Sequence, residues 1–190
     1  GKLIDVQSFD KVAAESIASD QDHQEVSSVE YASAEHKGSA VHALDIVILS
    51  ALEVDVNFNV NVLVGSDGII RGAVGGHPDT AEDSALSIIV CPLLRGRIPC
   101  VVPKVTTLIT PGKSVDVVVT EYGIAVNPAR HEIAERLVEA GLKVVDINDL
   151  AAKAKSIIGE PDALPFGNKV VGIVVDRHGD VLDEIRNIED

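Results

Sequence analysis

The sequence of 190 residues contains no methionine and no tryptophan, and aromatic residues make up only 3% of it. Its core must therefore consist of valine, isoleucine, leucine and alanine, a composition typical of α/β proteins with buried, β-branched strands. Because the chain begins with Gly1 and lacks methionine, we expect it to be a piece of a longer polypeptide. No apolar run approaches the ~20 residues that span a bilayer, and no signal-peptide pattern opens the chain, so we expect a cytoplasmic protein without a membrane partner.

Cysteine is scarce as well. Cys91 and Cys100 lie in apolar surroundings, and neither belongs to a Cys-x-x-Cys pair or a histidine-rich ligand set. We therefore expect two buried free thiols, no disulfide framework and no bound metal. The Gly-x-Ser-x-Gly elbow of serine hydrolases is also missing, which gives triad hydrolysis little support.

Basic residues are too few to balance the acidic ones, and the net charge of −14 argues against a nucleic-acid partner. Residues 84–115 nevertheless contain no acidic side chain. The basic residues of this stretch, with one that shortly precedes it, are Arg71, Arg95, Arg97, Lys104 and Lys113. A locally basic strip on an acidic protein suits an anionic substrate, although chance clustering on a solvated face fits the pattern equally well.

From residue 45 onward, apolar strands alternate with amphipathic helices. Residues 1–44 are polar and acidic, with weak helical patterning over 9–17, and form an N-terminal segment that leads into a domain of residues 45–190. Strands are predicted at 45–50, 57–64, 68–74, 87–91, 101–109, 115–120 and 143–147, and helices at 78–86, 129–140 and 148–158. Residues 169–176 and 181–188 predict a terminal hairpin. The order indicates an α/β fold with an open, largely parallel mixed sheet flanked by helices and a C-terminal β-hairpin.

Two of these strands carry more specific expectations. The continuous apolar run at 45–50 is typical of a strand buried on both faces. Polar and apolar residues alternate over 57–64, which predicts a half-exposed strand with Asn57, Asn59 and Asn61 on one side.

The run GSDGIIRGAVGGHPDT at residues 65–80 predicts a turn, a strand, a glycine pair and a proline that opens a helix. A glycine pair lets the backbone approach a ligand closely, and the helix start offers free N–H groups to a carboxylate, a phosphate or an oxyanion. The spacing is neither the dinucleotide fingerprint nor a P-loop. A tight packing turn without a ligand explains the same pattern.

Two titratable residues near this run could take part in chemistry. Glu53 follows the strand at 45–50, where a desolvated carboxylate could act as base or nucleophile, or could instead bind backbone N–H groups or an arginine. His77 stands at the start of the predicted helix, where a neutral imidazole could donate to a carbonyl or carboxylate, or could be a surface loop residue.

Several segments together resemble the citrate lyase alpha chain. They are residues 49–55 (LSALEVD), 58–61 (FNVN), 65–80, 92–99 (PLLRGRIP) and 118–130 (VVTEYGIAVNPAR). The resemblance extends over nearly the whole chain and is most specific from residue 45 onward. More broadly, the strand, glycine pair and helix followed by Val-Thr-Glu-x-Gly are similar to the beta-type half of CoA-transferases, which implies the open α/β sheet of that superfamily.

The resemblance implies a citrate CoA-transferase activity, in which citrate replaces acetate on an acyl-carrier thioester and a beta chain then cleaves the citryl thioester. Gly75 and Gly76 would form the oxyanion side of the site, with Glu53 as the candidate catalytic carboxylate. The substrate-binding candidates are Arg71, His77, Asn59, Asn61, Arg95 and Arg97, the last two suiting citrate or a phosphopantetheine phosphate. No tightly bound cofactor is implied, only the thioester of CoA or of a carrier prosthetic group as co-substrate. The implied partners are citrate and the gamma and beta subunits, in an oligomer.

The sequence also departs from the wider superfamily. Many CoA-transferases use a glutamate nucleophile in a Ser-Glu-Asn-Gly segment, which is missing here, whereas the citrate lyase alpha chain is thought to exchange acyl groups directly through an anhydride. The alpha chain is also much longer, with a second, N-terminal α/β domain. Two alternatives stay open: a CoA-transferase or hydrolase for another carboxylic acid, and a non-catalytic assembly domain of the lyase complex.

Overall fold

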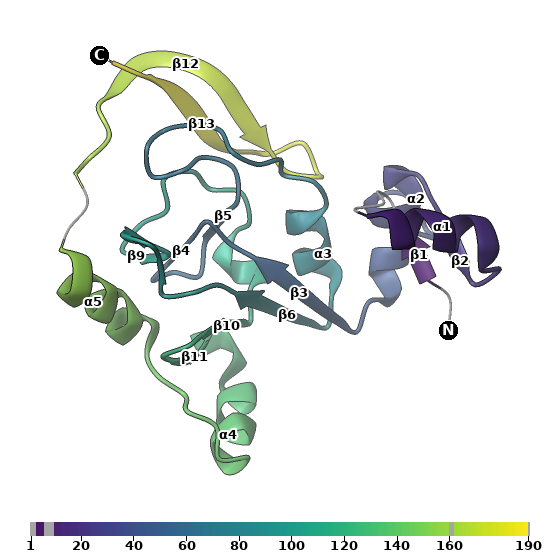
Figure 1. The fold of residues 1–190 in the computed structure, drawn as a ribbon, viewed down its shortest axis with the longest axis horizontal. Coiled ribbons are helices and arrows are strands. Elements are labelled where there is room, and N and C mark those ends of the chain that lie inside the picture. Colours follow the sequence, from purple (N-terminus) through teal and green to yellow (C-terminus); the bar gives the residue numbers. More distant parts are fainter. Residues whose placement is uncertain (1–2, 6–9, 160–161, 190) are drawn as a thin grey trace.

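The computed structural model describes residues 3–5, 10–159 and 162–189 (Figure 1). Its centre is a four-stranded sheet in the order β11–β10–β6–β3. The strands are β3 (Ile46–Ser50), β6 (Leu86–Val90), β10 (Val117–Thr120) and β11 (Gly123–Val126). β3, β6 and β10 run parallel, and β11 returns antiparallel to β10. The predicted open, largely parallel mixed sheet is confirmed.

A smaller sheet shares the core with this one. It has the order β5–β4–β9, formed by β5 (Val60–Asn61), β4 (Glu53–Asp55) and β9 (Val101–Val102). A two-stranded ribbon, β7 (Leu94–Arg95) and β8 (Ile98–Pro99), lies between β6 and β9 in the chain. Val54 and Val101 of the smaller sheet and Ile89 and Val118 of the larger one belong to one buried cluster, so the two sheets stabilise each other.

Helices flank the sheets much as the periodicity predicts. They are α3 (His77–Asp83), α4 (His131–Glu139) and α5 (Ile147–Ile158), with short 3-10 turns η2 (Gly112–Ser114) and η3 (Pro128–Arg130). α5 begins at the N-cap Asp146 and buries Ile147, Leu150 and Ala154 in the core. α4 contacts β11 but buries none of its side chains completely, so it is the less firmly attached helix.

The chain ends in the predicted hairpin, β12 (Phe166–Val175) and β13 (Val181–Ile188), which arches over the smaller sheet in Figure 1. The side chain of Asp183 accepts a hydrogen bond from the backbone of Leu108 at 2.8 Å. At the hairpin tip, Arg177 bonds Asp83 of α3 at 2.7 Å. The hairpin is therefore attached to the body of the domain at both places.

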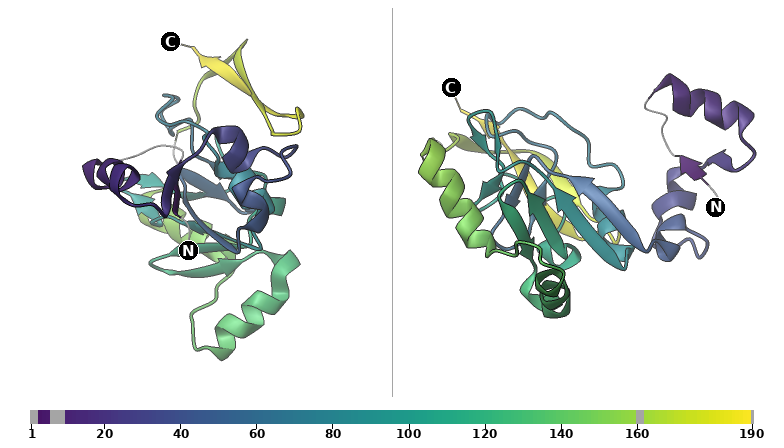
Figure 2. Two further views of the ribbon diagram at one scale, coloured as in Figure 1. Left: turned by 90° about the vertical axis from the view of Figure 1, so that its right-hand side faces the viewer. Right: turned by 60° about the horizontal axis from the view of Figure 1, so that its bottom comes forward.

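The N-terminal segment lies beside the sheet rather than in it, as Figures 1 and 2 show. It contains β1 (Leu3–Asp5), α1 (Lys11–Ser19), β2 (His23–Glu25), α2 (Ser28–Ala32) and the 3-10 helix η1 (Ala40–Ala43). The helical patterning predicted over 9–17 is confirmed for its described part, since Asp10 caps α1; Phe9 lies outside the described residues. η1 contacts α3, and His42 pairs with Asp83 at 3.4 Å, which joins the segment to the domain.

The prediction that residues 45–50 are buried on both faces is wrong. β3 is the edge strand of its sheet, and the side chains of Ile46 and Ile48 are 54% and 68% exposed. Only the face that carries Val47 and Leu49 turns toward the core. A continuous apolar run therefore identified the strand but not its place in the sheet.

Four other strand predictions are wrong in extent. Residues 57–64 contain only the two-residue β5 and a bridge at Val64, and residues 101–109 contain only β9. Residues 68–74 and 143–147 contain only isolated bridges, at Ile70 and Val144. Phe58 has a φ of +65°, which breaks the predicted alternation of the asparagines. Asparagine and aspartate side chains bond the backbone throughout this region and replace ladder hydrogen bonds.

Candidate functional site

The candidate site lies at the carboxyl end of β3, where two segments that are distant in sequence meet. The carbonyl oxygen of Ser50, the last residue of β3, lies 2.9 Å from Nε2 of His77. The next carbonyl, that of Ala51, accepts a hydrogen bond of 2.9 Å from Nη2 of Arg95. The sequence-predicted residues His77 and Arg95 are therefore brought to the same edge of the sheet, the edge at which open α/β sheets bind ligands.

His77 is engaged at both ring nitrogens. Besides Nε2 at Ser50, its Nδ1 lies 2.7 Å from the hydroxyl of Thr110. Since a carbonyl can only accept, we assign the proton to Nε2 and let Nδ1 accept from the threonine. Burial lowers the pKa of His77, against a smaller opposing effect of the Ser50 carbonyl. The imidazole is thus neutral, and it anchors the start of α3 to β3.

The glycine pair precedes His77 directly. Gly75 adopts a φ of +53°, which favours glycine, and the space where its Cβ would stand is empty to 4 Å. At Gly76 a Cβ would lie 3.1 Å from the ring of Tyr31, so α2 covers this position. Within the part of the chain that the structure describes, the N–H groups of Gly75 and Gly76 donate no hydrogen bond. Neither donor is used within this part of the fold, and Gly75 is exposed.

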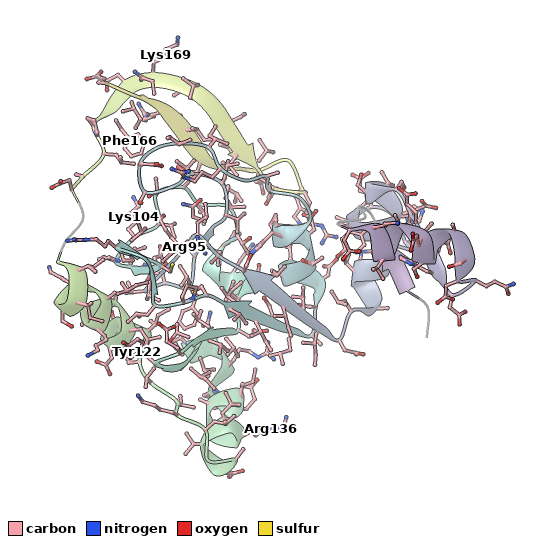
Figure 3. All side chains as sticks on the ribbon, in the orientation of Figure 1. Arg95, Lys104, Tyr122, Arg136, Phe166 and Lys169 are labelled. Atoms are coloured by element: carbon pink, nitrogen blue, oxygen red, sulfur yellow. The ribbon has the colours of Figure 1, made fainter. Side chains whose placement is uncertain are left out.

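Two of the three arginines that the sequence singles out, Arg71 and Arg95, line a cavity of about 320 Å³. Its lining residues are Leu52, Glu53, Gly65, Ser66, Asp67, Arg71, Arg95 and Ile98. Arg71 comes from the glycine run and Arg95 from β7, so the fold gathers two guanidinium groups separated by 24 positions in sequence. Figure 3 shows Arg95 in the middle of the molecule. Two guanidinium groups at one cavity suit a ligand with more than one carboxylate.

Arg71 and Arg95 differ in their partners. Arg71 forms an ion pair with Asp67, which lines the same cavity. Arg95 donates to the Ala51 carbonyl but forms no ion pair within the described residues. Arg97 follows in the turn of the β7–β8 ribbon, where it is exposed and does not line the cavity.

Glu53 lines the cavity, but its carboxylate is fully engaged. One oxygen accepts from the backbone N–H of Thr106 at 2.7 Å and from Nδ2 of Asn61 at 2.8 Å, and the other accepts from the Thr106 hydroxyl at 2.9 Å. The residue is only 5% exposed. This geometry favours the alternative interpretation of Glu53 as a carboxylate that binds backbone and side-chain donors; its role as base or nucleophile stays a prediction.

The side-chain amides of Asn59 and Asn61 also form hydrogen bonds within the chain. Asn61 donates to Glu53 and to the Val64 carbonyl, and its oxygen accepts from the N–H groups of Leu63 and Val64. Asn59 donates to Asp55 and accepts from the Gly112 N–H. The two residues do not form the common exposed face that alternation predicts. They shape the loops that hold the cavity.

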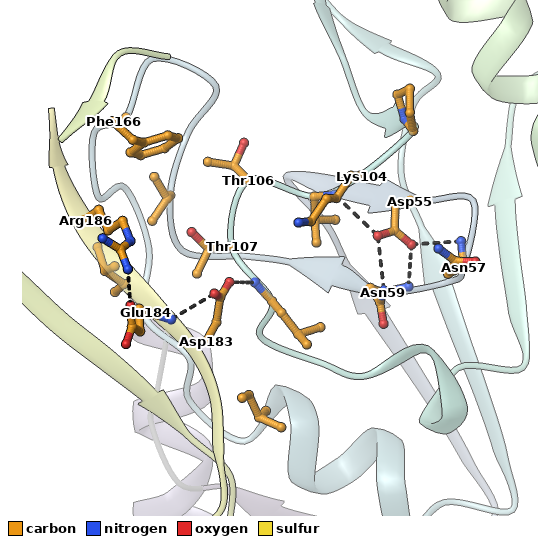
Figure 4. Close-up of a pocket in the computed structure, with 17 residues that line it drawn as sticks. Asp55, Asn57, Asn59, Lys104, Thr106, Thr107, Phe166, Asp183, Glu184 and Arg186 are labelled. Carbon is orange, nitrogen blue, oxygen red and sulfur yellow. Dashed lines mark hydrogen bonds and ion pairs between the residues drawn. The ribbon is translucent and has the colours of Figure 1, made fainter. Parts of the chain in front are cut away.

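A second, larger cavity of about 720 Å³ lies under the C-terminal hairpin (Figure 4). Asn59 is the one predicted site residue among the residues that line it. Lys104, from the acid-free strip, projects into it opposite Thr107 and Phe166. Lys113 is in η2 and lines neither of these cavities. The residues of the basic strip are therefore not gathered at one cavity.

Several contributors were not found from the sequence. Thr106, which holds Glu53, lies in the stretch 101–109 that was predicted as a strand, and Thr110, which holds His77, directly follows it. Asp67 could have been recognised, because it stands four residues before Arg71 and carries the opposite charge. The buried free thiols Cys91 and Cys100 are confirmed, and burial raises the pKa of Cys91 to about 12, so it carries no thiolate chemistry near neutral pH.

The described residues contain neither a metal-binding cluster nor a membrane-spanning helix. Among residues 3–5, 10–159 and 162–189, no group of three or more His, Cys, Asp or Glu side chains could hold a metal ion. In the same ranges, no helix has the length and apolar character needed to cross a membrane.

Comparison with known proteins identifies the family. The model of the family "Citrate lyase, alpha subunit (CitF)" matches residues 1–188. The chain is 57% identical to the citrate lyase alpha chain of Escherichia coli and 52% identical to that of Haemophilus influenzae, in both over 189 residues that cover all of this chain. It spans 37% and 38% of the length of these two relatives.

A solved structure agrees with the sequence matches. The alpha subunit of citrate lyase from Streptococcus mutans, in complex with citrate, superposes with a TM-score of 0.96 at 48% identity, covering 100% of this chain and 37% of that one. The family match, the two relatives and this structure agree over nearly the whole sequence. The chain belongs to the citrate lyase alpha-subunit family.

Proposed function

We propose that this chain forms part of a citrate CoA-transferase subunit, which exchanges acetate for citrate on an acyl-carrier thioester. The observation that carries the proposal is the cavity in which Arg71 and Arg95 meet beside the carboxyl end of β3. Family membership and the citrate complex of the Streptococcus mutans relative support citrate as the ligand. The co-substrate is the thioester of CoA or of a carrier prosthetic group.

The exchange needs two acyl transfers. A citrate carboxylate attacks the acetyl thioester carbonyl and expels the thiolate, which leaves a mixed anhydride. The thiolate then attacks the citryl carbonyl of this anhydride and expels acetate. Each step passes through a tetrahedral oxyanion, and the free N–H groups of Gly75 and Gly76 are suited to stabilise it.

The remaining predicted residues receive supporting roles in this proposal. Arg71 and Arg95 hold citrate carboxylates, and Arg97, exposed on the adjoining turn, reaches a phosphate of the carrier group. His77 positions the glycine pair through its bonds to Ser50 and Thr110. Asn59, Asn61 and Glu53 position the loops around the cavity. The partners are citrate and the gamma and beta subunits, in an oligomer in the cytoplasm.

Calorimetric titration of the chain with citrate tests the ligand assignment in this proposal. Arg71→Gln and Arg95→Gln should each weaken binding on the order of tenfold or more, because each removes a charged hydrogen-bond donor from a carboxylate. Arg136→Gln is the matched control, since Arg136 lies on α4, well away from Arg95 in Figure 3. Wild-type affinity in both cavity variants would refute the assignment, as would an equal loss in the control.

A further inference from the structure

Asp67 introduces a negative charge into a cavity that otherwise suits an anion. Its Oδ2 pairs with the Nη2 atom of Arg71, one of the two guanidinium groups at the cavity. The hydrogen bond from Arg71 is the main reason that the pKa of Asp67 lies below its ordinary value. Asp67 is therefore ionised at neutral pH, and a carboxylate of the protein itself already occupies Arg71.

The turn that carries Asp67 is built to place this contact. Gly68 donates to the Gly65 carbonyl at 2.9 Å, and Gly65 donates to the Ile69 carbonyl at 2.8 Å, which closes the turn. A Cβ on Gly65 would stand 2.8 Å from Oδ1 of Asp67 and 2.9 Å from Nε of Arg71. The ion pair therefore lies directly over Gly65, in room that any other residue would fill.

The other charged side chains at the cavity, Glu53 and Arg95, are not part of this ion pair. The carboxylate of Glu53 is held by Thr106 and Asn61 and does not pair with either arginine. Arg95 forms no ion pair with any described residue. Arg95 is thus open to a ligand, whereas Arg71 is masked.

We propose that Asp67 stands in for a substrate carboxylate on Arg71, and that a polycarboxylate displaces it when its second carboxylate reaches this arginine. The inference rests on the proposed function and adds a specific residue to it. Asp67 acts as an intramolecular competitor that lowers the affinity of the cavity for its ligand.

The geometry indicates that displacing Asp67 from Arg71 costs little free energy. The side chains of Arg71 and Asp67 are 53% and 45% exposed, and exposed ion pairs are weak because water screens both charges. The other oxygen of Asp67 accepts from the Ile69 N–H at 3.2 Å, so the turn persists when Oδ2 leaves Arg71. A bidentate contact between Arg71 and a ligand carboxylate would replace the single contact with Asp67.

Citrate titrations of three variants test the masking. Asp67→Asn should bind citrate about two- to fivefold more tightly than the wild type, the range expected for loss of an exposed competing pair. Asp67→Glu keeps the carboxylate and should stay within twofold of the wild type. Glu184→Gln removes a similarly exposed carboxylate from its pair with Arg186 on the hairpin and should leave citrate binding unchanged.

The outcomes separate this inference from the function on which it rests. If the wild type binds citrate and Asp67→Asn binds it equally or more weakly, Asp67 orients Arg71 instead of masking it, and the inference is overturned. An equal gain in Glu184→Gln would overturn it as well, because the effect would then be general electrostatics. If the wild type binds no citrate, the proposed function itself fails.

Discussion

His77 gives the stability of the domain a specific pH dependence. Burial holds its pKa in the folded chain below the ordinary value of 6.5, so the unfolded chain binds a proton first as the pH falls. The free energy of unfolding should therefore be unaffected by this group above pH 6.5 and decrease between 6.5 and the lower folded pKa. Urea unfolding at a series of pH values from 8 to 5 measures the slope.

The slope can be assigned with two histidine variants. His77→Gln should flatten the decrease below pH 6.5, because the titrating group is gone, whatever its effect on absolute stability. His131→Gln should leave the slope as it is, since His131 is 79% exposed on α4. A wild-type slope in His77→Gln would show that other groups cause the acid sensitivity.

Glu53 permits a test that separates a structural role from a catalytic one. Glu53→Ala leaves the donors of Thr106 and Asn61 without their buried acceptor and should lower the free energy of unfolding by about 3 kcal/mol. The exposed Glu135 of α4 is the control, and Glu135→Ala should cost less than about 0.5 kcal/mol. If Glu53→Ala were as stable as the control but inactive in acyl exchange, the catalytic interpretation would be favoured.

The sequence predicted which residues lie near the site better than it predicted the hydrogen bonds that they form. The absence of acidic residues around Arg95 suited an anion site and chance clustering equally, and the structure adds that Arg71 and Arg95 line one cavity. The role of Asn59 could not be predicted, because the positive φ at Phe58 interrupts the alternation and its partner Gly112 lies 53 positions further along the chain. Contacts of that sequence separation leave no periodic signal.

At the scale of elements, the hairpin tip holds the helix that follows the glycine pair. Nη1 of Arg177 donates to Oδ2 of Asp83 at 2.7 Å and to the Asp79 carbonyl at 3.2 Å, and its side chain is only 7% exposed. Arg177→Ala should lower the free energy of unfolding by about 2–3 kcal/mol, because it leaves Asp83 partly buried without this cation.

Arg186 on the same hairpin is the matched control for that substitution. Its pair with Glu184 is exposed on both sides, so Arg186→Ala should cost less than about 1 kcal/mol. Chemical unfolding of the two variants side by side measures the difference. Equal stability of the two would show that the hairpin tip does not hold α3.

Element types were predictable wherever the local pattern was strong. Helices α4 and α5 and the terminal hairpin follow from apolar spacing and from turn residues that lie within the elements themselves. The predicted strand at 143–147 is only a bridge between Val144 and Ile124. The prediction that β3 is buried on both faces was wrong because the position of a strand in its sheet depends on neighbouring strands elsewhere in the chain.

For the whole molecule, the exposed apolar face of the central sheet and the high net charge have opposite effects on self-association. Ile46, Ile48 and Val90 are on this face, in register with Leu86, Ile88 and Ser50. Parallel sheets are ordinarily covered on both faces, and an apolar edge strand invites pairing with another chain. The net charge of −14 keeps copies apart over roughly a Debye length, about 10 Å at 0.1 M salt and 3 Å at 1 M.

Self-association of the 190-residue chain should therefore increase with both protein and salt concentration, since salt screens the repulsion while the apolar face remains. Sedimentation velocity at 0.1 and 1 M sodium chloride measures it. Ile48→Lys should reduce the association by placing a charge on the face, whereas Val12→Lys, on the exposed surface of α1, should not. A monomer at every concentration, or an equal effect of the two substitutions, would show that association does not depend on this face. A reduction specific to Ile48→Lys would instead identify the uncovered side of β3 and β6 as the surface by which copies of this chain associate.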